Sequence, residues 1–195
     1  MCQNAGMPRT MDVDERRRVV SEAAWRVLVR DGPAEMSVRR VAAEAGLPPS
    51  SLRYTFPTQA SVRSAAVHLL VERVRQRVVR AAGAARGVDS ARAILLELLP
   101  LDAERRDEME VTVSLMALAT AEPALREAHE LSHRVVRDVC AEALAHLGAS
   151  PSDVDLDLTH AVVDGLALHL LAHDLGQDAS WAIAAVDRHL GSLRT

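Results

Sequence analysis

Aromatic residues are scarce in this chain of 195 residues, which contains two Trp, one Tyr and one Phe. Lysine is absent, so all 23 basic residues are arginine. Two cysteines are too few for a disulfide framework and favour a reducing cytoplasm. The sequence shows no basic-then-apolar leader and no apolar run long enough to span a bilayer. We therefore expect a cytoplasmic protein with neither a secretory signal nor a membrane span.

About half of the residues are apolar (49%), which is enough for a sizeable core. Their spacing is helical, and no alternating strand pattern, internal repeat or low-complexity linker interrupts it. The fold class predicted is all-α with about nine helices, and residues 1–11 are expected to form a flexible tail. The helices are expected near residues 12–31, 37–45, 48–56, 58–86, 89–99, 102–121, 123–148, 153–176 and 179–193.

The segment SVRRVAAEAGLPPSSLRYTFPTQASVR, residues 37–63, has the pattern of a helix-turn-helix. Ser37 can cap the first short helix through its hydroxyl, and Gly46 can adopt the positive φ at which that helix ends. Two prolines follow the turn and suit the first turn of a second short helix. Leu52 and Phe56, four residues apart, would hold this second helix against the core. Its small polar side chains would then project outward, into the major groove of DNA.

The run AEAGLPPSSLRYTFPTQASV resembles the N-terminal domain of TetR/AcrR-type bacterial transcriptional regulators. Upstream, VVSEAAWRVLVRDG resembles the first helix of that family, so the likeness covers roughly residues 13–63. It implies a DNA-binding domain at residues 1–57 and an effector-binding and dimerisation domain at residues 58–195. Two residues depart from the family pattern. Arg53 stands where an aromatic is usual, and Gln59 replaces a common lysine.

The helix-turn-helix predicts which side chains contact DNA. Side chains of its first helix and of its N-cap would fix the register on the backbone, and those of the second helix would reach base edges or phosphates. Arg53 is expected to reach a guanine or a phosphate, and Gln59 can donate to a phosphate without bringing charge. The residues predicted to bind DNA are Ser37, Arg39, Arg40, Pro49, Ser50, Ser51, Arg53, Tyr54, Thr55 and Gln59.

The charge is divided unevenly along the chain. Residues 1–86 hold 15 arginines and 8 acidic residues, a net charge of +7, whereas residues 87–195 hold 8 arginines and 19 acidic residues, a net charge of −11. A basic first half and an acidic second half would orient the molecule with one end toward a phosphate backbone. Within the first half, the arginines at positions 73, 75, 77 and 80 are expected to lie mostly on a solvated helix face.

The last two predicted helices carry more apolar residues than one flank of a small bundle needs. The family resemblance implies that they pair with their copies across a two-fold axis, although about half of these residues would be ordinary core. Such a homodimer would present two recognition helices to a palindromic operator, about 34–36 Å apart. The residues predicted to take part in dimerisation are Val162, Leu166, Leu170, Trp181, Val186 and Leu190.

The resemblance also implies a ligand cavity among the middle helices, whose filling releases DNA from a repressor. Residues 101–129 resemble the C-terminal domain of the BetI-like branch. Because three of the four aromatic residues lie in the DNA-binding region, an aliphatic or polar small effector is expected rather than a flat aromatic one. The predicted pocket residues are Met109, Val113, Met116, Asp164 and His169.

One motif suggests a different class of protein. His129-Glu130-Leu131-Ser132-His133 matches H-E-x-x-H, in which two histidines on one helix face bind zinc and the glutamate activates water. A catalytic site would also need a third ligand and a substrate cleft, and no strand is predicted. We expect no enzymatic activity, no metal and no cofactor, and we expect Cys140 to be a packed side chain rather than a redox sensor. A zinc-dependent hydrolase and a helical interaction protein that does not bind DNA remain as alternatives.

Overall fold

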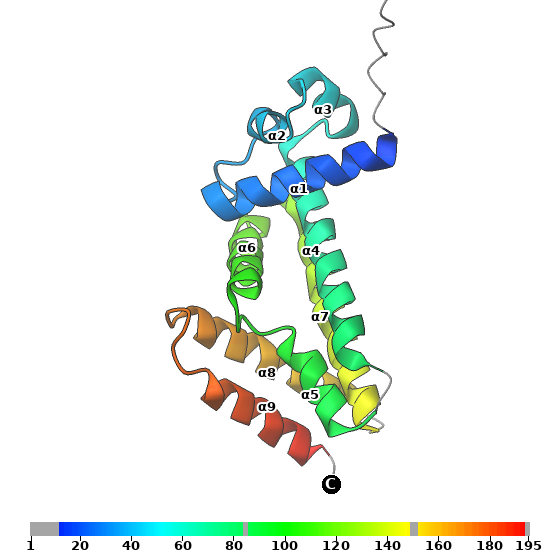
Figure 1. Ribbon diagram of the computed structural model, residues 1–195, viewed down its shortest axis with the longest axis vertical. Helices are drawn as coiled ribbons and strands as arrows, with labels where there is room; N and C mark the ends of the chain where they lie inside the picture. Colours follow the sequence, from blue (N-terminus) through cyan, green and yellow to red (C-terminus); the bar gives the residue numbers. More distant parts are fainter. Residues whose placement is uncertain (1–11, 84–85, 149–151, 194–195) are drawn as a thin grey trace, which may run out of the picture.

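The computed structural model describes residues 12–83, 86–148 and 152–193, and this part of the chain contains helices and no strand (Figure 1). The all-α prediction is confirmed, with nine α-helices and one 3-10 turn in the described ranges. The expected flexible tail, residues 1–11, lies outside them. The elements are α1 (Val13–Asp31), α2 (Val38–Glu44), α3 (Pro49–Thr55), α4 (Gln59–Ala82), α5 (Val88–Leu96), α6 (Ala103–Ala119), η1 (Pro123–Leu125), α7 (Arg126–Leu147), α8 (Asp153–Leu171) and α9 (Ser180–Ser192).

Most helices begin directly after a residue whose side chain caps their first turn. The hydroxyl of Ser37 accepts a hydrogen bond from the backbone N–H of Arg40 (3.2 Å), as expected for the start of α2. Thr58 caps α4 by accepting from the N–H of Ser61 (3.0 Å). The side chain of Ser61 accepts in return from the N–H of Thr58 (3.2 Å), which completes a capping box. These local bonds fix where α2 and α4 start, whereas α3 starts at a proline and has no side-chain cap.

Two helices end earlier than expected. Helix α4 stops at Ala82 rather than near Arg86, because Gly83 follows with a φ of 56°, a conformation that favours glycine. Helix α8 stops at Leu171, five residues before the expected end at Gly176, and an exposed connection leads from there into α9. Gly46 has the positive φ predicted for the turn between α2 and α3 (66°).

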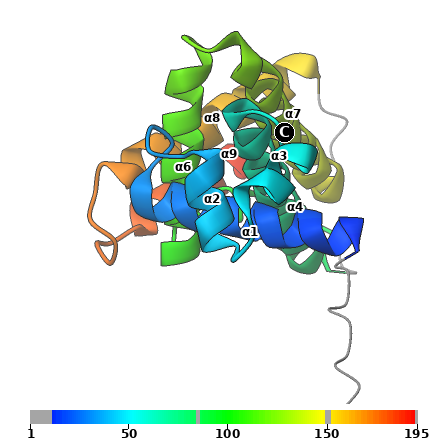
Figure 2. The same cartoon turned by 90° about the horizontal axis from the view of Figure 1, so that it is seen from above.

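The helices form an elongated arrangement with two ends (Figure 1). Helices α1, α2 and α3 make one end, called here the front end, and lie nearest the viewer when the molecule is seen from above (Figure 2). Helices α5, α8 and α9 make the opposite rear end. Helices α4, α6 and α7 connect the two ends (Figure 1). In the described part of the chain, no helix is long and apolar enough to cross a membrane.

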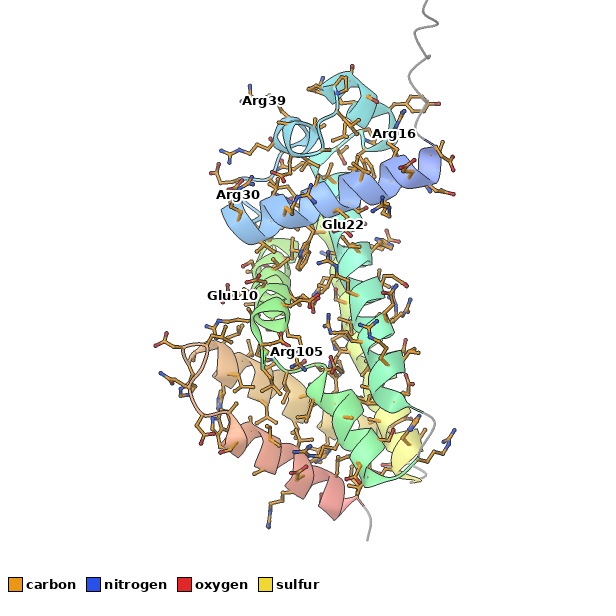
Figure 3. The ribbon with its side chains drawn as sticks, viewed as in Figure 1. Arg16, Glu22, Arg30, Arg39, Arg105 and Glu110 are labelled. Carbon is orange, nitrogen blue, oxygen red and sulfur yellow. The ribbon has the colours of Figure 1, made fainter. Side chains whose placement is uncertain are left out.

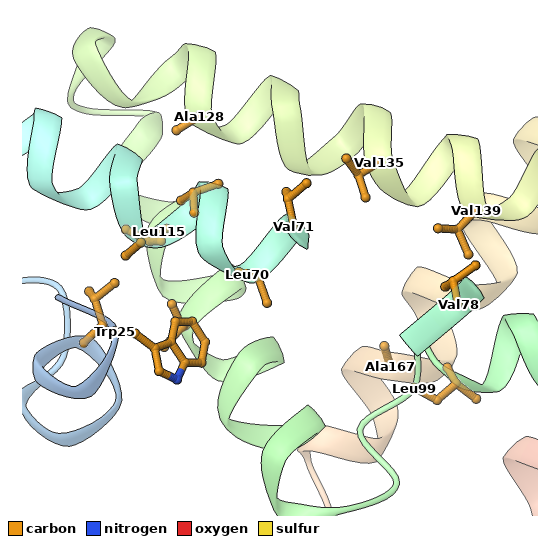
Figure 4. Packing of buried hydrophobic residues seen from close by; sticks show 14 of the residues in the cluster. Trp25, Leu70, Val71, Val78, Leu99, Leu115, Ala128, Val135, Val139 and Ala167 are labelled. Atoms are coloured by element: carbon orange, nitrogen blue, oxygen red, sulfur yellow. The ribbon is translucent and has the colours of Figure 1, made fainter. Parts of the chain in front are cut away.

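One continuous core joins the two ends. It extends from Trp25 of α1 to Ala167 of α8, and side chains of α4 and α7 alternate across its middle (Figure 4). Helix α4 contributes to the core along its whole length, since both Val62 and Val78 are buried. A displacement of α4 in the rear would therefore be transmitted to the helices of the front end.

Candidate DNA-binding face and ligand cavity

Helix α3 is held against the front end by the two side chains that the sequence predicts. Leu52 is fully buried and Phe56 is 8% exposed, and each such side chain contributes roughly 1.5–3 kcal/mol by its removal from water. The opposite side of the helix faces solvent. Arg53 is exposed, and Tyr54 is 91% exposed although most of its ring is apolar. The helix is thus fixed by one face and presents the other outward.

The small residues of α3 differ in accessibility. Pro49 and Ser50 are exposed, whereas Ser51 and Thr55 are half-buried. The predicted DNA contacts of this helix therefore lie on its outer surface or at its edge. In the described structure none of them is fully buried, so each can still be reached by a partner.

The arginines of the front end fall into two groups. Arg26, Arg30 and Arg40 belong to a set of surface ion pairs that also contains Glu44, Asp31 and Glu35. Arg40, which was expected to contact the DNA backbone, is part of this set. Its Nη2 lies 2.9 Å from Glu35 and its Nη1 lies 3.4 Å from Asp31.

Arg39 and Arg53 belong to the second group, because neither forms an ion pair with any described residue. Figure 3 shows Arg39 directed away from the body of the molecule at the front end. Both side chains are exposed. Positive charge that no carboxylate of the described structure balances therefore lies on α2 and α3, and also at the start of α1, where Arg17 and Arg18 are exposed without an ion pair.

Gln59, expected to contact a phosphate, is exposed but makes a hydrogen bond within the protein. Its side-chain amide donates a hydrogen bond to the backbone carbonyl of Met36, in the segment that precedes α2. Because Gln59 is the first residue of α4, this bond ties the start of α4 to the helix-turn-helix. Its observed role is to position one element relative to another.

A buried arginine makes a second link between the front end and the rest. Arg63 of α4 is 4% exposed, and its guanidinium lies 2.7 Å from the Glu122 carboxylate, which follows α6. It also donates to the backbone carbonyl of Pro33, between α1 and α2 (2.8 Å). One side chain thus joins α4, the end of α6 and the front end.

The expectation of a solvated arginine face on α4 is wrong for two of its four residues. Arg75 and Arg80 are exposed, as predicted. Arg73 instead pairs with Glu22 of α1 at 2.8 Å and lies over the ring of Trp25, 5.2 Å from its centroid. The other exception, at position 77, lies in the interior of the rear part and belongs to a cavity.

This cavity, of about 80 Å³, lies between α4, α6 and α7 and continues into a smaller one. The two share the side chains Leu70, Thr112 and Ser132. Most of the wall of the larger cavity is aliphatic. The lining residues are Leu70, Val71, Val74, Arg77, Glu97, Leu98, Arg105, Glu108, Met109, Thr112, Ser132, Val135 and Val136.

A network of charged side chains forms the polar part of the cavity. Arg77 binds Glu108 with two parallel contacts, of 2.8 Å from Nη1 and 2.5 Å from Nη2, and its Nε donates to Glu97 (3.1 Å). Arg105 lies 3.6 Å from the same oxygen of Glu97. Glu108 is 5% exposed, and burial raises the pKa of its carboxyl, an effect that the neighbouring Arg77 opposes.

The structure brings two of the five predicted pocket residues to these cavities. Met109 lines the larger cavity and Met116 the smaller one. Val113, Asp164 and His169 line neither: Asp164 instead lies 3.3 Å from the ring nitrogen of His160.

The charged lining residues were missed, although the sequence contained one signal for them. Leu70, Val74 and Arg77 recur at i, i+4 and i+7, which places the arginine on the apolar face of α4. The partners of Arg77 lie 20 and 31 residues away along the chain, and no local pattern joins them.

Four of the six residues expected at a dimer interface are core residues of the single chain. Leu166, Leu170, Val186 and Leu190 are each at most 9% exposed, because α8 and α9 turn these side chains toward their own core. Val162 is half-buried and Trp181 is 38% exposed.

The exposed apolar side chains of α8 lie on its opposite face. They form a stripe at helical spacing that we call the α8 stripe, made of Val154, Leu158, Ala161, Gly165 and Leu168. Leu158 is 51% exposed and Leu168 is 47% exposed. A Cβ added at Gly165 would meet no atom within 4 Å, so no helix of the same chain approaches closely there.

The H-E-x-x-H segment lies on α7, and its two histidines have different surroundings. His129 lines the smaller cavity, and the ring of His133 packs against that of His160 with centroids 4.5 Å apart. Among the residues that the structure describes, no group of three or more His, Cys, Asp or Glu side chains is arranged to hold a metal. Cys140 is fully buried, and burial raises the pKa of its thiol to about 12.

Comparison with known proteins gives consistent results. A family model described as the C-terminal domain of BetI-type transcriptional repressors matches residues 87–195. The HTH-type transcriptional regulator PksA of Bacillus subtilis (strain 168) is 32% identical over 175 residues, which cover 85% of this chain and 83% of that protein.

Solved structures share the fold. A transcriptional regulator from Rhodococcus sp. Rha1 has a TM-score of 0.76 at 24% identity, over 91% of this chain and 95% of that one. The multidrug binding protein EbrR, complexed with ethidium, has a TM-score of 0.67 at 31% identity, over 90% of this chain and 98% of that one.

Proposed function

Because this chain belongs to the TetR family of transcriptional regulators, with a C-terminal domain of the BetI type, we propose that it is a repressor released by a small molecule. It binds a palindromic operator as a homodimer. Residues 1–57 bind DNA, and residues 58–195 bind the effector and the second copy. The protein acts in the cytoplasm and is not an enzyme. The observation that carries the proposal is the outward face of α3, with its exposed Arg53 and Tyr54.

The front end is suited to a duplex in shape and in charge. Helix α3 is short enough to enter a major groove end-on, and its outer face carries Ser50 and Arg53 for base edges. Arg39 on α2 would contact the flanking phosphates, since no carboxylate of the described structure balances its charge. Tyr54 and Thr55 can donate hydroxyl hydrogen bonds to the same backbone.

The α8 stripe supports dimerisation. Its exposed leucines and Gly165 would let the α8 helices of two copies approach closely, with α9 alongside. In a two-fold dimer both copies bury the same stripe residues. Each leucine therefore contributes to the free energy of dimerisation once from each copy. We therefore propose the same two helices as the interface, with Leu158, Ala161 and Leu168 in place of the four core residues.

The cavity and α4 together support release by an effector. Helix α4 lines the cavity with Leu70 and Val74, and its first turns are bonded to the front end through Gln59 and Arg63. A ligand that pushes α4 away from α6 and α7 would therefore change the position of α3. The ethidium complex of EbrR is an example of a related protein with a small molecule bound.

Fluorescence anisotropy with purified protein tests the DNA-binding part. A labelled duplex is first enriched from a random library, and its affinity is then compared with that of an unrelated duplex at two salt concentrations. We expect tighter binding to the enriched duplex and a loss of affinity as salt increases. An affinity that is independent of both sequence and salt would contradict the proposal. Arg30→Ala serves as the matched control variant, because Arg30 is already paired with Asp31 and Glu44.

A further inference from the structure

We infer that the cavity between α4, α6 and α7 takes an aliphatic ammonium ion, a primary or secondary amine with an apolar tail. It rejects carboxylates, and it prefers an ammonium with N–H groups to a quaternary one. The inference rests on the proposed function, in which this cavity is the effector site. It follows from three properties of the lining: which hydrogen-bonding groups are already used, which charge is in excess, and what the walls are made of.

Each nitrogen of the two cavity arginines already faces an acceptor of the protein. All three nitrogens of Arg77 point at carboxylates, two at Glu108 and one at Glu97. Arg105 donates from Nε to Asp102 (3.0 Å) and from Nη1 to the carbonyl of Leu96 (3.0 Å). A carboxylate ligand could reach only the second N–H groups of the terminal nitrogens, where it would lie beside the negative charges of Glu97 and Glu108.

The acceptors of the cavity are only partly used. Both arginine contacts of Glu97 go to its Oε2, so Oε1 has no hydrogen bond in the described structure. The hydroxyl of Thr112 donates to the carbonyl of Glu108 (2.8 Å), and that of Ser132 to the carbonyl of Ala128 (3.4 Å). Each hydroxyl therefore turns its lone pairs to the surroundings. The open positions are acceptors, and they match a ligand that brings N–H groups.

The charge of the network favours a cation. Two arginines, Arg77 and Arg105, stand against four carboxylates. Glu97 and Glu108 line the cavity, while Glu104 (4.0 Å from Arg77) and Asp102 (2.9 Å from Arg105) lie behind it. With all four carboxyls ionised the network carries a net charge of −2. Glu104 and Asp102, which supply this excess, are 65% and 54% exposed, so solvent screens part of their attraction for a cation. The nearer attraction is that of Glu97 and Glu108 in the lining itself.

The walls select the type of cation. No residue that lines either cavity is a Phe, Tyr or Trp, so a quaternary ammonium would find none of the ring faces that bind such ions best. Such an ion also lacks N–H groups and would leave the open acceptors unsatisfied. The aliphatic side chains around the network, among them Leu70, Val74 and Met109, suit a flexible alkyl tail.

Isothermal titration calorimetry on the full-length protein tests the inference with four probes of equal chain length: hexylamine, hexyltrimethylammonium, hexanoate and 1-hexanol. We expect hexylamine to bind at least about tenfold more tightly than the other three, a difference of about 1.4 kcal/mol. Equal or tighter binding of hexanoate or of hexyltrimethylammonium would overturn the inference. So would the absence of hexylamine binding at about 10 mM, since even a small ligand that fits gains enough per atom to be detected there.

Two variants locate the site. Glu97→Gln removes a charge and a free acceptor from a side chain that is only 22% exposed, and we expect it to weaken hexylamine binding about tenfold or more. Glu110→Gln is the matched control: it lies on the outer side of α6 (Figure 3), pairs with Arg106 and should leave binding unchanged. Thermal unfolding of both variants verifies that they are folded. Equal binding by the two variants would contradict the proposed site.

The same samples separate this inference from the proposed function. If hexylamine binds in the cavity without weakening the complex with the enriched duplex, the ligand class is supported and release by that ligand is contradicted. If hexylamine does not bind while the duplex still binds in a sequence-dependent way, the ligand class is contradicted and DNA binding stands.

Discussion

The two ends of this protein use the same residue types in opposite ways. At the front end, Arg39 and Arg53 project into solvent without a carboxylate partner in the described structure. Toward the rear, Arg77 and Arg105 are enclosed by four carboxylates, whereas leucines of the α8 stripe are exposed. Because the chain has no lysine, arginine serves both as an unbalanced surface charge and as an internal cross-link.

This contrast shows that the charge of a region predicts its partner only when the charges already paired within the molecule are left out of the sum. The charges of Arg26, Arg30 and Arg40 are balanced by Asp31, Glu35 and Glu44, and the unbalanced arginines lie on α3, on the outer side of α2 and at the start of α1. In the rear, the exposed apolar surface and the excess of acidic residues favour the proposed second copy of the chain over a polyanion. The predictions below test this division.

The largest expected effect concerns the apolar surface of the rear. Leu168→Asp would place a carboxylate in the proposed two-fold interface, twice per dimer. Loss of two leucine contacts alone costs roughly 3–6 kcal/mol of dimerisation free energy. We expect mostly monomer in sedimentation velocity at concentrations where the unaltered protein is dimeric. Val79→Asp is the control, because Val79 is 69% exposed on α4, outside the α8 stripe, and its replacement should leave the dimer intact. A dimer that survives Leu168→Asp would exclude the α8 stripe from the interface.

The next effect concerns the internal arginine. Arg77→Ala leaves Glu108 buried without its partner, and removal of one member of such a pair typically lowers the free energy of unfolding by about 3 kcal/mol. Urea denaturation of the variant measures this loss. Arg53→Ala should change stability by less than about 0.5 kcal/mol, since Arg53 is an exposed surface residue. Similar stabilities for the two variants would remove the contrast between internal and surface arginines.

For DNA binding we expect the opposite order, with a larger loss of affinity from Arg53→Ala than from Arg77→Ala. Arg53→Ala should cost about 1–3 kcal/mol of binding to the enriched duplex if Arg53 reads a base. Anisotropy titrations on the enriched and on an unrelated duplex measure this. Equal weakening on both duplexes would make Arg53 a backbone contact.

The sequence predicted the front end well because its structure depends on neighbours in the chain. The cap at Ser37, the positive φ at Gly46 and the buried pair Leu52 and Phe56 are all determined within a few residues. Once they are in place, the outer face of α3 follows from helix geometry. This is why the family pattern could be recognised from a quarter of the chain.

The rear was predicted as helices but not as a site. The partner of Arg77 on α6 lies 31 residues away, and the two come together only because α4 and α6 both pack against α7. On α8, apolar residues occur on both faces, so spacing alone does not tell Leu166, which is buried, from Leu168, which is exposed. Composition therefore indicated an apolar excess on α8 and α9, but four of the six residues chosen for an interface lie in the core of the single chain.

The smallest predicted effect compares two adjacent arginines of α2. Arg39 has no ion pair in the described structure, whereas Arg40 contacts both Asp31 and Glu35. Arg39→Ala should weaken binding to all duplexes to a similar degree and lower the salt slope by about 1, because one phosphate contact is lost. Arg40→Ala should change both quantities less, since its charge is already balanced. Anisotropy titrations over a range of salt concentrations measure the slopes. A larger effect at position 40 would mean that DNA phosphates displace Asp31 and Glu35 from Arg40, and that internal pairing at the front end does not predict which arginines bind.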